Sequence, residues 1–435
     1  MNNKNDKVPE LVRRAITDYD MLSKEDTVLV GFSGGSDSVC LLSVLAEMGY
    51  KVTAAHLNHN MRDTAKRDMD FCDRFCRERN IPFVSKTVKK GTLKNEADAR
   101  EARYSFFAEV MSERGIDKLA TAHNKNDSAE TVMLHLLRGA STDGLCGISA
   151  TDSKVIRPLI YVKKSEVNDY CNENNISYVT DETNLTNKYT RNKLRNIYIP
   201  QLENEFNPKL IDTIADNAVL MSYDRDFLLK SANIAYENIK RKKGVDVIEF
   251  SKLDRAISSR VAEIMWQKAV DDLKNLSGKY IEEIIKLASC GKSGKGVDLP
   301  LNCVARVEYG ELILEKKTEY KLFEREIEID KWYDFPEIES KIGIFQEGKG
   351  LVISLDGNEK LLIRNRKQGD RFSPAGLGGS KSVSNYLTDA KLPKAERNRL
   401  PLLIANGKVA ALGNLRADEE FSKGKRATNY VLVIK

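Results

Sequence analysis

The stretch from Thr27 to Cys40 constrains the fold more than any other part of the chain. It begins with a short apolar run rich in Val and Leu, which is typical of a buried strand. A Ser-Gly-Gly-Ser turn follows at residues 33–36, and the apolar pattern from Val39 to Leu45 then predicts a helix that faces a core. A strand joined to a helix by a glycine turn predicts an α/β unit with this loop at a helix N-terminus.

The turn has the chemistry of a phosphate-binding loop. Backbone N–H groups at a helix N-terminus have no partner within the helix, and the helix dipole favours an anion there. Glycine lets the main chain approach a phosphate closely because it has no Cβ. Asp37 would repel a phosphate unless a cation lay between them, so we expect Asp37 to bind Mg²⁺. The candidate ligands of ATP in this 33–38 loop are Ser33, Gly34, Gly35, Ser36, Asp37 and Ser38.

Two better-known nucleotide loops are excluded. Residues 291–293 read Gly-Lys-Ser, like the end of a Walker A loop, but Lys286 stands where its first glycine is needed. No G-x-G-x-x-G follows a strand either. Ser-Gly-Gly-x-Asp-Ser after a strand resembles instead the pyrophosphate loop of N-type ATP pyrophosphatases, which bind ATP and release pyrophosphate. The alternative is an ordinary glycine turn with a capping serine.

Strands and helices alternate through the first half of the chain. Strand-like runs fall at 52–57, 83–88, 119–122 and 155–159, and helical patterns at 63–79, 95–113 and 127–138. Repeated βα units predict a doubly wound, mostly parallel sheet with helices on both faces. Ligands of such sheets bind beyond the carboxyl ends of the strands. The 33–38 loop, residues 56–60 and residues 123–127 should therefore meet in one crevice.

A second polar group follows the predicted fourth strand. Asp127 and Glu130 lie three residues apart at a helix start, so both side chains face the same way. Such a pair could hold a metal or recognise an ammonium group, but acids at a helix start also act as caps. This segment alone does not decide between the two readings. His56, His59 and His123 fall at strand ends and are candidates for nucleotide binding.

These segments together resemble the tRNA(Ile)-lysidine synthetases. The shared motifs are the 33–38 loop, His-x-x-His at 56–59, Ala-Thr-Ala-His and Asp-x-Ala-Glu-Thr within 120–131, and Asp-x-Thr-Asn with Tyr-x-Arg-Asn-x-x-Arg within 181–195. The resemblance covers residues 25–210 and resumes at 361–421. Asn124 and Asn126 stand where the family usually has a histidine and an aspartate, and Ser128 stands where glutamine is usual.

The resemblance implies a ligation in two steps, with ATP and Mg²⁺ as cofactors. ATP adenylates the C2 oxygen of the wobble cytidine, position 34, in tRNA(Ile) with the anticodon CAU. L-lysine then displaces AMP through its ε-amine and forms lysidine, which changes codon reading from AUG to AUA and the identity of the tRNA from Met to Ile. The lysine amine, whose ordinary pKa is about 10.4, would be bound or deprotonated by Asp127 and Glu130. By family position, Arg191 and Arg195 would contact phosphate or the activated base, so the expected catalytic residues are Asp37, Asp127, Glu130, Arg191 and Arg195.

Charge and pattern divide the chain into four parts. We expect an ATP pyrophosphatase domain at 1–205, a small helical domain at 206–320, a linker at 321–355 and a small, basic α+β domain at 356–435. The last part has 16 Lys and Arg against 8 Asp and Glu, and the whole chain has 70 and 64, which leaves 54 and 56 for the rest. A segregated basic module indicates a polyanionic partner, most simply nucleic acid, although a solvated basic surface would have the same composition.

The basic segment resembles the C-terminal tRNA-binding domain of the longer lysidine synthetases. Arginine forks bind phosphate well, and contacts with the phosphate backbone position RNA without reading its sequence. The residues that we expect to bind tRNA are Arg364, Arg366, Lys367, Arg371, Arg397 and Arg399.

Composition limits the class of protein further. With 41% hydrophobic and 31% charged residues, the chain is typical of a soluble globular protein. It has no run of 18 apolar residues and a polar N-terminus, so we expect neither a membrane span nor a secretory signal. Its 7 cysteines include no C-x-x-C pair, which fits a reducing, cytoplasmic location. A homodimer is a possible assembly.

Three other functions stay open. A tRNA 2-thiolation enzyme shares the nucleotide fold, but it usually needs cysteine pairs that this chain lacks. A nitrogen-transfer ligase would not explain the basic tail. A non-catalytic RNA-binding protein with a vestigial ATP site would not need the intact 33–38 loop together with Asp127 and Glu130.

Overall fold

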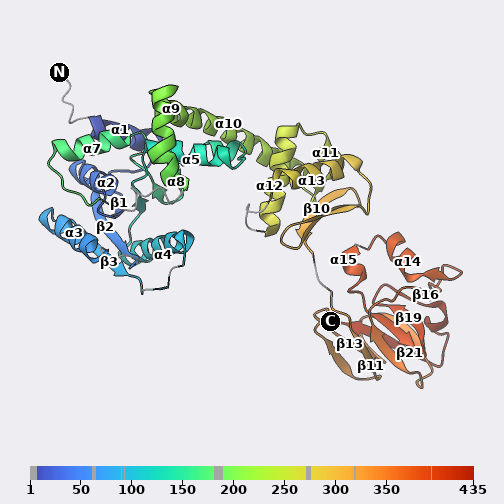
Figure 1. Cartoon of the computed structure of the whole chain (residues 1–435). Coiled ribbons are helices and arrows are strands. Elements are labelled where there is room, and N and C mark those ends of the chain that lie inside the picture. The colour runs from blue at the N-terminus through green and yellow to red at the C-terminus, as the bar shows by residue number, and fades with distance from the viewer. Residues whose placement is uncertain are drawn as a thin grey trace. The chain divides into compact units, whose positions relative to one another are not determined.

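The computed structural model describes residues 7–60, 65–89, 91–92, 94–180, 190–270, 276–317, 320–392 and 394–435. The motif residues at 181–184 and Tyr189 therefore lie outside the described residues. The chain forms two compact units, Met1–Phe227 and Leu228–Lys435, of which the first runs from blue to green in Figure 1. Within the described ranges, no helix has the length and apolar character needed to cross a membrane.

The first unit is built on a six-stranded sheet with the strand order β3-β2-β1-β4-β6-β5. Its strands are β1 (Thr27–Gly31), β2 (Lys51–Asn58), β3 (Phe83–Thr87), β4 (Lys118–Ala120), β5 (Thr151–Asp152) and β6 (Val155–Ile156). All neighbours are parallel except β5 and β6. The chain runs from β1 outward to β3 and then returns to the other side of β1 at β4. The carboxyl ends of β1 and β4 therefore flank the topological switch point, where ligands of such sheets bind.

Helices cover both faces of this sheet (Figure 1). They are α1 (Lys7–Asp18), α2 (Ser36–Glu47), α3 (Ala65–Glu78), α4 (Glu96–Arg114), α5 (Lys125–Leu137), α6 (Thr142–Leu145) and α7 (Lys164–Glu173). Buried side chains of α1, α2, α3 and α7 share one core with Val28 and Val30 of β1. On the other face, Phe106 and Phe107 of α4 pack with Leu29, since successive side chains of a strand alternate between faces. The predicted doubly wound α/β fold is confirmed.

A helical segment follows the sheet. It consists of α8 (Thr190–Lys193), a π-helical turn (Leu194–Tyr198), α9 (Ile199–Glu205) and α10 (Leu210–Ile239). The boundary between the two units falls within α10. Leu194, Ile199 and Ile211 pack with Ala129 of α5 in a small core, which fixes α8 and the π-helical turn beside the start of α5.

The second unit begins with a central module of three helices and a small antiparallel sheet. The helices are α11 (Val247–Ser251), α12 (Arg255–Val270) and α13 (Gly278–Cys290), and the sheet has the order β7-β10-β9-β8. Its strands are β7 (Val245–Asp246), β8 (Gly296–Leu299), β9 (Cys303–Glu308) and β10 (Glu311–Lys316). Phe250 and Trp266 are fully buried in the core of this module.

The rest of the second unit, residues 323–435, is a C-terminal module with two main sheets. One has the order β11-β15-β18-β19-β20 and the other the order β12-β13-β21-β14. Their strands are β11 (Glu324–Ile327), β12 (Trp332–Phe335), β13 (Ser340–Phe345), β14 (Leu351–Leu355), β15 (Leu361–Arg364), β18 (Leu402–Ala405), β19 (Lys408–Leu412), β20 (Arg416–Ala417) and β21 (Thr428–Ile434). Smaller elements are β16 (Arg371–Phe372), β17 (Lys381–Ser382), α14 (Val383–Asp389), α15 (Lys394–Arg397) and a 3₁₀ turn (Glu419–Phe421). Ile342 and Ile353 of one sheet share a core with Leu361 and Leu403 of the other, as in a β-sandwich. Trp332 lies on an edge strand, with its ring centroid 4.9 Å from that of Phe345.

The structure differs from the linker that we expected over 321–355. This segment supplies β11 to one sheet and β12, β13 and β14 to the other. Its strand pattern is obscured because β11 and β12 are edge strands, and edge strands carry charged side chains on their exposed positions. Glu324 and Glu326 of β11 are two such exposed residues. The C-terminal module therefore begins at Phe323, which is buried in the shared core, rather than at 356.

Candidate functional site

The 33–38 loop connects the carboxyl end of β1 to the N-terminus of α2. Gly34 has a φ of +84°, and a Cβ there would lie 3.1 Å from Cys72 Sγ and 3.3 Å from the Phe71 ring. A left-handed φ and this close approach together require glycine. Ser38 Oγ donates to the carbonyl oxygen of Gly35 at 3.0 Å, which keeps the loop tightly turned.

Three helix N-termini meet at Asp37. Asp37 itself lies in the first turn of α2, and Asn124, the N-cap of α5, donates from Nδ2 to Asp37 Oδ1 at 2.9 Å. Lys164, the first residue of α7, places its Nζ 2.6 Å from Asp37 Oδ2 and 2.8 Å from Ser36 Oγ. The partner of the Asp37 charge in this structure is thus a lysine of the chain itself. Lys164 was not among the site residues expected from the sequence, although two consecutive lysines at a helix start are an unusual pattern, because the helix dipole opposes them.

The residues around Asp37 fit Mg²⁺ only if a ligand supplies further oxygens. In the described part of the chain, no group of three or more His, Cys, Asp or Glu side chains could hold a metal ion. Mg²⁺ is usually held by one or two carboxylates together with substrate phosphates and water. Asp37 supplies one such carboxylate near the end of the phosphate loop, and bound phosphates would supply the other oxygens.

Asp127, Glu130, Arg191 and Arg195 form one cluster, which we call the acid–arginine cluster. Glu130 Oε2 lies 2.8 Å from Arg191 Nε, and Glu130 Oε1 lies 2.5 Å from Arg195 Nε. Asp127 Oδ1 lies 2.8 Å from Arg195 Nη2. The Glu130 side chain is 2% exposed and that of Asp127 is 17% exposed, against 41% and 39% for the two arginines. The two positive charges compensate the buried carboxylates, which would be costly without a partner.

Asp127 also caps helix α5, so both readings of this acid apply. Asn124 Oδ1 accepts a hydrogen bond from the backbone N–H of Asp127 at 3.0 Å, and Asp127 Oδ2 accepts one from the backbone N–H of Asn124 at 3.1 Å. This reciprocal pair is a capping box. One carboxylate oxygen of Asp127 thus serves the helix and the other faces the arginines. Burial alone would lower the pKa of Arg195, but its bonds with Glu130 and the nearby charge of Asp127 raise it.

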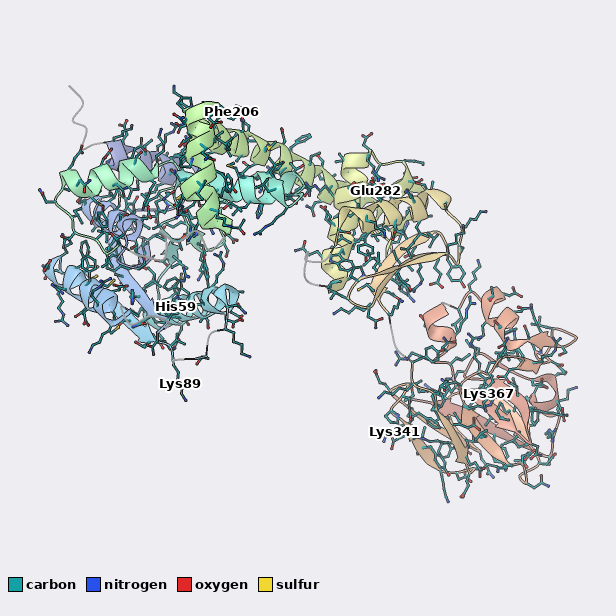
Figure 2. All side chains as sticks on the ribbon, viewed as in Figure 1. His59, Lys89, Phe206, Glu282, Lys341 and Lys367 are labelled. Carbon is teal, nitrogen blue, oxygen red and sulfur yellow. The ribbon has the colours of Figure 1, made fainter. Side chains whose placement is uncertain are left out.

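The surroundings of His56 and His123 disfavour a positively charged imidazole. His56 is buried, with Nδ1 2.8 Å from the carbonyl oxygen of Phe32, and burial lowers its pKa. Burial, followed by the positive charges of Arg157, Arg100 and other arginines, lowers the pKa of His123 to about 4. Both imidazoles are therefore neutral at pH 7. His59 directly follows β2 and is half-buried (Figure 2).

A second charged network joins the site to helix α10. Asp212, in the first turn of α10, accepts from Lys125 Nζ and from Lys163 Nζ, both at 2.8 Å. Lys125 is the first residue of α5 and Lys163 is the N-cap of α7. The same two helices that reach Asp37 are thus also fixed to α10, and the sequence patterns indicated none of these contacts.

Arg364 and Arg397, two of the six residues that we expected to bind tRNA, have guanidiniums that other groups of the protein hold. Arg364 is buried, and its guanidinium forms two hydrogen bonds of 2.8 Å with Asp370. We correct its role to a structural one, because a buried, paired guanidinium cannot reach an RNA phosphate. Arg397 donates to the carbonyl oxygen of Leu392 at 2.7 Å and to Thr388 Oγ1 at 2.8 Å. Its fork is therefore largely occupied.

The other four differ in exposure. Lys367, labelled in Figure 2, is exposed and pairs with Glu324 at 2.6 Å. Arg371 is also exposed and borders a cavity of about 990 Å³ that is lined by a glycine-rich loop at 376–380. Arg366 and Arg399 are half-buried. Arg366 also donates from Nε and Nη2 to Asn398 Oδ1, at 3.0 and 2.7 Å. Lys367 and Arg371 are thus the two of the six that are exposed to a large polyanion.

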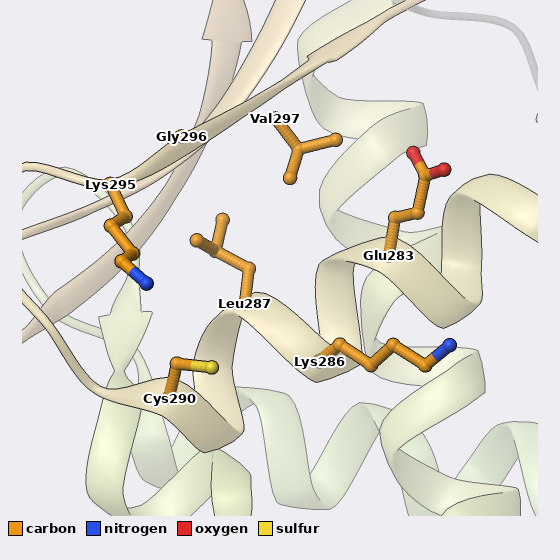
Figure 3. Close-up of a pocket in the computed structure, with 7 residues that line it drawn as sticks. All are labelled: Glu283, Lys286, Leu287, Cys290, Lys295, Gly296 and Val297. Carbon is orange, nitrogen blue, oxygen red and sulfur yellow. The ribbon is translucent and has the colours of Figure 1, made fainter.

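A smaller cavity of about 370 Å³ lies between α13 and β8 of the central module (Figure 3). Lys286 and Cys290 come from the helix, and Val297 comes from the strand. None of the site residues expected from the sequence lines this cavity, so it is separate from the candidate site.

Comparisons with known proteins agree with both ends of the chain. Residues 4–202 match a family described as PP-loop domain, and residues 361–434 match the TilS substrate C-terminal domain. The chain is 31% identical to the tRNA(Ile)-lysidine synthase of Caldanaerobacter subterraneus subsp. tengcongensis, over 98% of this chain and 97% of that protein. It is 32% identical to the tRNA(Ile)-lysidine synthase of Clostridium acetobutylicum, over 95% and 96%.

Among solved structures, the chain is similar to the U34-tRNA thiolase NcsA of Methanococcus maripaludis, with a TM-score of 0.43 and 20% identity over 50% of this chain and 79% of that chain. The relatives named above match almost from end to end, and they confirm the resemblance that the motifs indicated. The phosphate loop and residues 361–434 of the C-terminal module both fall within matched families. The chain therefore belongs to the tRNA(Ile)-lysidine synthase family, whose PP-loop domain binds ATP.

Proposed function

We propose that this chain carries out the ligation that its family membership implies. It adenylates the C2 oxygen of cytidine 34 in tRNA(Ile) with the anticodon CAU, and it joins that carbon to the ε-amine of L-lysine to form lysidine. One observation carries the proposal at the level of the site. The phosphate loop after β1 and the acid–arginine cluster beside β4 lie at the carboxyl ends of adjacent strands, and Asn124 contacts both of them.

The first step needs an activated phosphate. The C2 carbonyl of cytosine is a poor electrophile, and adenylation turns its oxygen into a leaving group. We propose that the 33–38 loop and the N-terminus of α2 stabilise the negative charge that develops on the departing pyrophosphate. Asp37 would hold Mg²⁺ against the phosphates, and the ion supplies further charge neutralisation when it is bound there.

The second step needs an oriented amino acid. Free lysine carries a carboxylate and ammonium groups, and the acid–arginine cluster offers partners for both kinds of charge. Arg191 and Arg195 are accessible enough to receive a carboxylate or phosphate, and Asp127 is the more exposed acid. Glu130 instead holds the two guanidiniums in place. Since the ε-amine must lose a proton before it attacks, Asp127 is the acid that we assign to orient or deprotonate it.

The remaining site residues have supporting roles. A neutral imidazole can donate and accept hydrogen bonds without adding charge, so we retain His56, His59 and His123 as candidates for contacts with the nucleotide. The target base must leave the anticodon stack to reach the loop, as with other enzymes that act on bases. We place these reactions in the 1–205 part of the chain.

The C-terminal module is the part that we propose binds tRNA. Residues 356–435 carry twice as many basic as acidic side chains. Lys367 and Arg371 are exposed on this module, and Arg366 and Arg399 are half-buried on it. Such contacts anchor the RNA backbone and leave the choice of base to the catalytic site.

We also propose that the chain forms a homodimer and acts in the cytoplasm. Leu220, Tyr223 and Phe227 of α10 are 61%, 60% and 70% exposed. Their spacing of three and four residues places them on one helix face, and contiguous exposed apolar patches mark interaction surfaces. Light scattering should give the dimer mass for the intact chain and a lower mass for Phe227→Lys. A monomeric mass at all concentrations would refute the dimer.

Transfer of labelled lysine tests the reaction. The purified chain should attach lysine to a CAU isoleucine tRNA transcript only when ATP is present, and AMP should form in equal amount. The matched control is the same transcript with uridine at position 34, which should stay unlabelled. If the cytidine transcript acquires no label under these conditions, the proposed reaction is wrong.

A further inference from the structure

Helix α7 begins with two lysines that have different partners. Lys163 Nζ contacts Asp212 at 2.8 Å, whereas Lys164 Nζ contacts Asp37 at 2.6 Å and Ser36 Oγ at 2.8 Å. A cation at a helix N-terminus is opposed by the dipole. Lys164 is therefore held at this position by the acid and the hydroxyl of the phosphate loop.

The surroundings of Asp37 combine a lysine, an amide donor and three helix starts. Asp37 lies in the first turn of α2 and is contacted by the N-cap of α5 and by the first residue of α7, and the start of each helix carries the positive end of its dipole. A pyrophosphate group carries several negative charges and would satisfy all three. Asp37 is thus an anion of the chain itself in a site that also suits a larger anion, such as pyrophosphate.

Lys164 is placed so that its ammonium can move from the Asp37 carboxylate to a bound phosphate. Its side chain is 40% exposed, so its ammonium can turn without any change in the fold. It already contacts Ser36, one of the residues that would surround the phosphates. A Walker A loop carries a lysine for this purpose, and the 33–38 loop has none.

We propose that Lys164 is a ligand of the pyrophosphate part of ATP, and that its ion pair with Asp37 is the form of the site without ligand. When ATP and a divalent cation bind, Asp37 turns to the cation and Lys164 turns to a phosphate oxygen. Every charge keeps an opposite partner in both forms. The loop thus obtains from α7 the lysine that its own sequence lacks. This inference rests on the proposed role of the loop as the ATP site.

Binding of inorganic pyrophosphate without divalent cations separates a direct contact from an indirect one. Asp37→Asn breaks the ion pair and leaves the Lys164 ammonium unpaired, so Asp37→Asn should bind pyrophosphate more tightly than the unchanged chain. Adding Lys164→Met should then weaken binding at least about tenfold, the loss expected for one charge-assisted hydrogen bond. Calorimetry on the full chain in the presence of a chelator measures both values. Equal affinity of Asp37→Asn and Asp37→Asn/Lys164→Met would overturn the inference.

Two matched variants complete this test. Asp37→Asn/Lys163→Met removes the neighbouring lysine, which contacts Asp212 instead, and should bind pyrophosphate like Asp37→Asn. Asp37→Asn/Lys164→Arg keeps the charge and should retain most of the affinity. If the methionine variant does not fold, pyrophosphate should still protect Lys164, but not Lys163, from acetylation in Asp37→Asn. Equal acetylation of Lys164 with and without pyrophosphate would contradict the proposal.

The proposed reaction can fail independently of this inference. If the chain transfers no lysine but Lys164 is required for pyrophosphate binding, only the reaction is wrong. If lysine is transferred but Lys164→Met binds pyrophosphate as the matched Lys163→Met does, only the role of Lys164 is wrong.

Discussion

At the scale of single residues, Asn124 combines two tasks in one amide. Its oxygen caps α5 and its nitrogen donates to Asp37. An amide can donate and accept at the same time without a change of protonation. One asparagine can therefore cap α5 and hold Asp37 at the same time.

Asn124→Ala should therefore lose both contacts. Loss of the N-cap should lower the free energy of unfolding by about 1 kcal/mol, and Asp37 should be less well held. Asn124→Asp is the matched control, because it keeps the cap but places a second carboxylate beside Asp37. Urea unfolding followed by circular dichroism at 222 nm checks the stability. If Asn124→Asp loses as much stability as Asn124→Ala, the cap is not the source of the effect.

Glu130 is the residue on which the acid–arginine cluster depends most. Glu130→Gln leaves two guanidiniums with the single carboxylate of Asp127, and breaking such a buried pair should cost on the order of 3 kcal/mol of unfolding free energy. Adding Arg195→Met should recover part of this loss, since one unpaired charge is then removed. Denaturant titrations of the single and double variants measure this coupling. A double variant less stable than Glu130→Gln would show that the pairing is not the cause.

His123 should make the stability depend on pH. Its pKa is about 4 in the folded chain and about 6.5 when unfolded, so the unfolded chain binds the proton first as pH falls. Its contribution to stability is complete above pH 6.5 and is lost progressively toward pH 4. At pH 5 the loss relative to pH 7.5 should be roughly 2 kcal/mol.

The matched variant is His123→Gln, which cannot titrate. Urea unfolding at pH 7.5 and pH 5 should show a smaller loss for His123→Gln than for the unchanged chain. An identical pH dependence in both would contradict the assigned pKa.

At the scale of elements, the phosphate loop depends on the conformation of one glycine. Gly34 and Gly49 have nearly the same φ, +84° and +85°, but a Cβ at Gly49 would have nothing within 4 Å. Gly49→Ala should therefore cost only the strain of a left-handed residue, about 1–3 kcal/mol, and keep ATP binding. Gly34→Ala should cost more and abolish ATP binding, since the methyl group meets Cys72 and Phe71. Calorimetric titration with ATP decides, and binding by Gly34→Ala would contradict the role of this turn.

The elements predicted best are those whose signals are local. The strand and the helix on either side of the 33–38 loop lie where the sequence predicted them. Helix α4 begins after its N-cap Asn95 and ends at its C-cap Gly115. Lys164 and Asp212 could not be assigned from local patterns, because their partners lie far away in the sequence. Two of the strands within 321–355, β11 and β14, were missed for the same reason, since their pairing partners β15 and β21 come later in the sequence.

At the scale of the whole molecule, the sequence boundary of the C-terminal module determines where a deletion of this module should begin. Deleting 356–435 would take away β15 and β21, leave β11 and β14 unpaired, and leave β13 paired with β12 on one side alone. Deleting 320–435 removes the module as a unit.

The shorter chain should bind tRNA more weakly, with a smaller dependence of affinity on salt, because fewer phosphates are neutralised. Filter binding at several salt concentrations measures both quantities. Lys367→Glu/Arg371→Glu in the full chain is the control that leaves the fold intact and should act in the same direction. If affinity and salt dependence survive both changes, the basic module does not hold the RNA.

Both tryptophans of the chain, Trp266 and Trp332, belong to the second unit. One is sealed in the core of the central module, and the other is 42% exposed on the C-terminal module. Fluorescence excited at wavelengths that only indole absorbs therefore reports on the second unit alone, because the ATP-binding unit contains no tryptophan. A quencher dissolved in the solvent should reach Trp332 and spare Trp266. The intact enzyme thus carries a native optical probe for events in the half proposed to receive tRNA, with no label required.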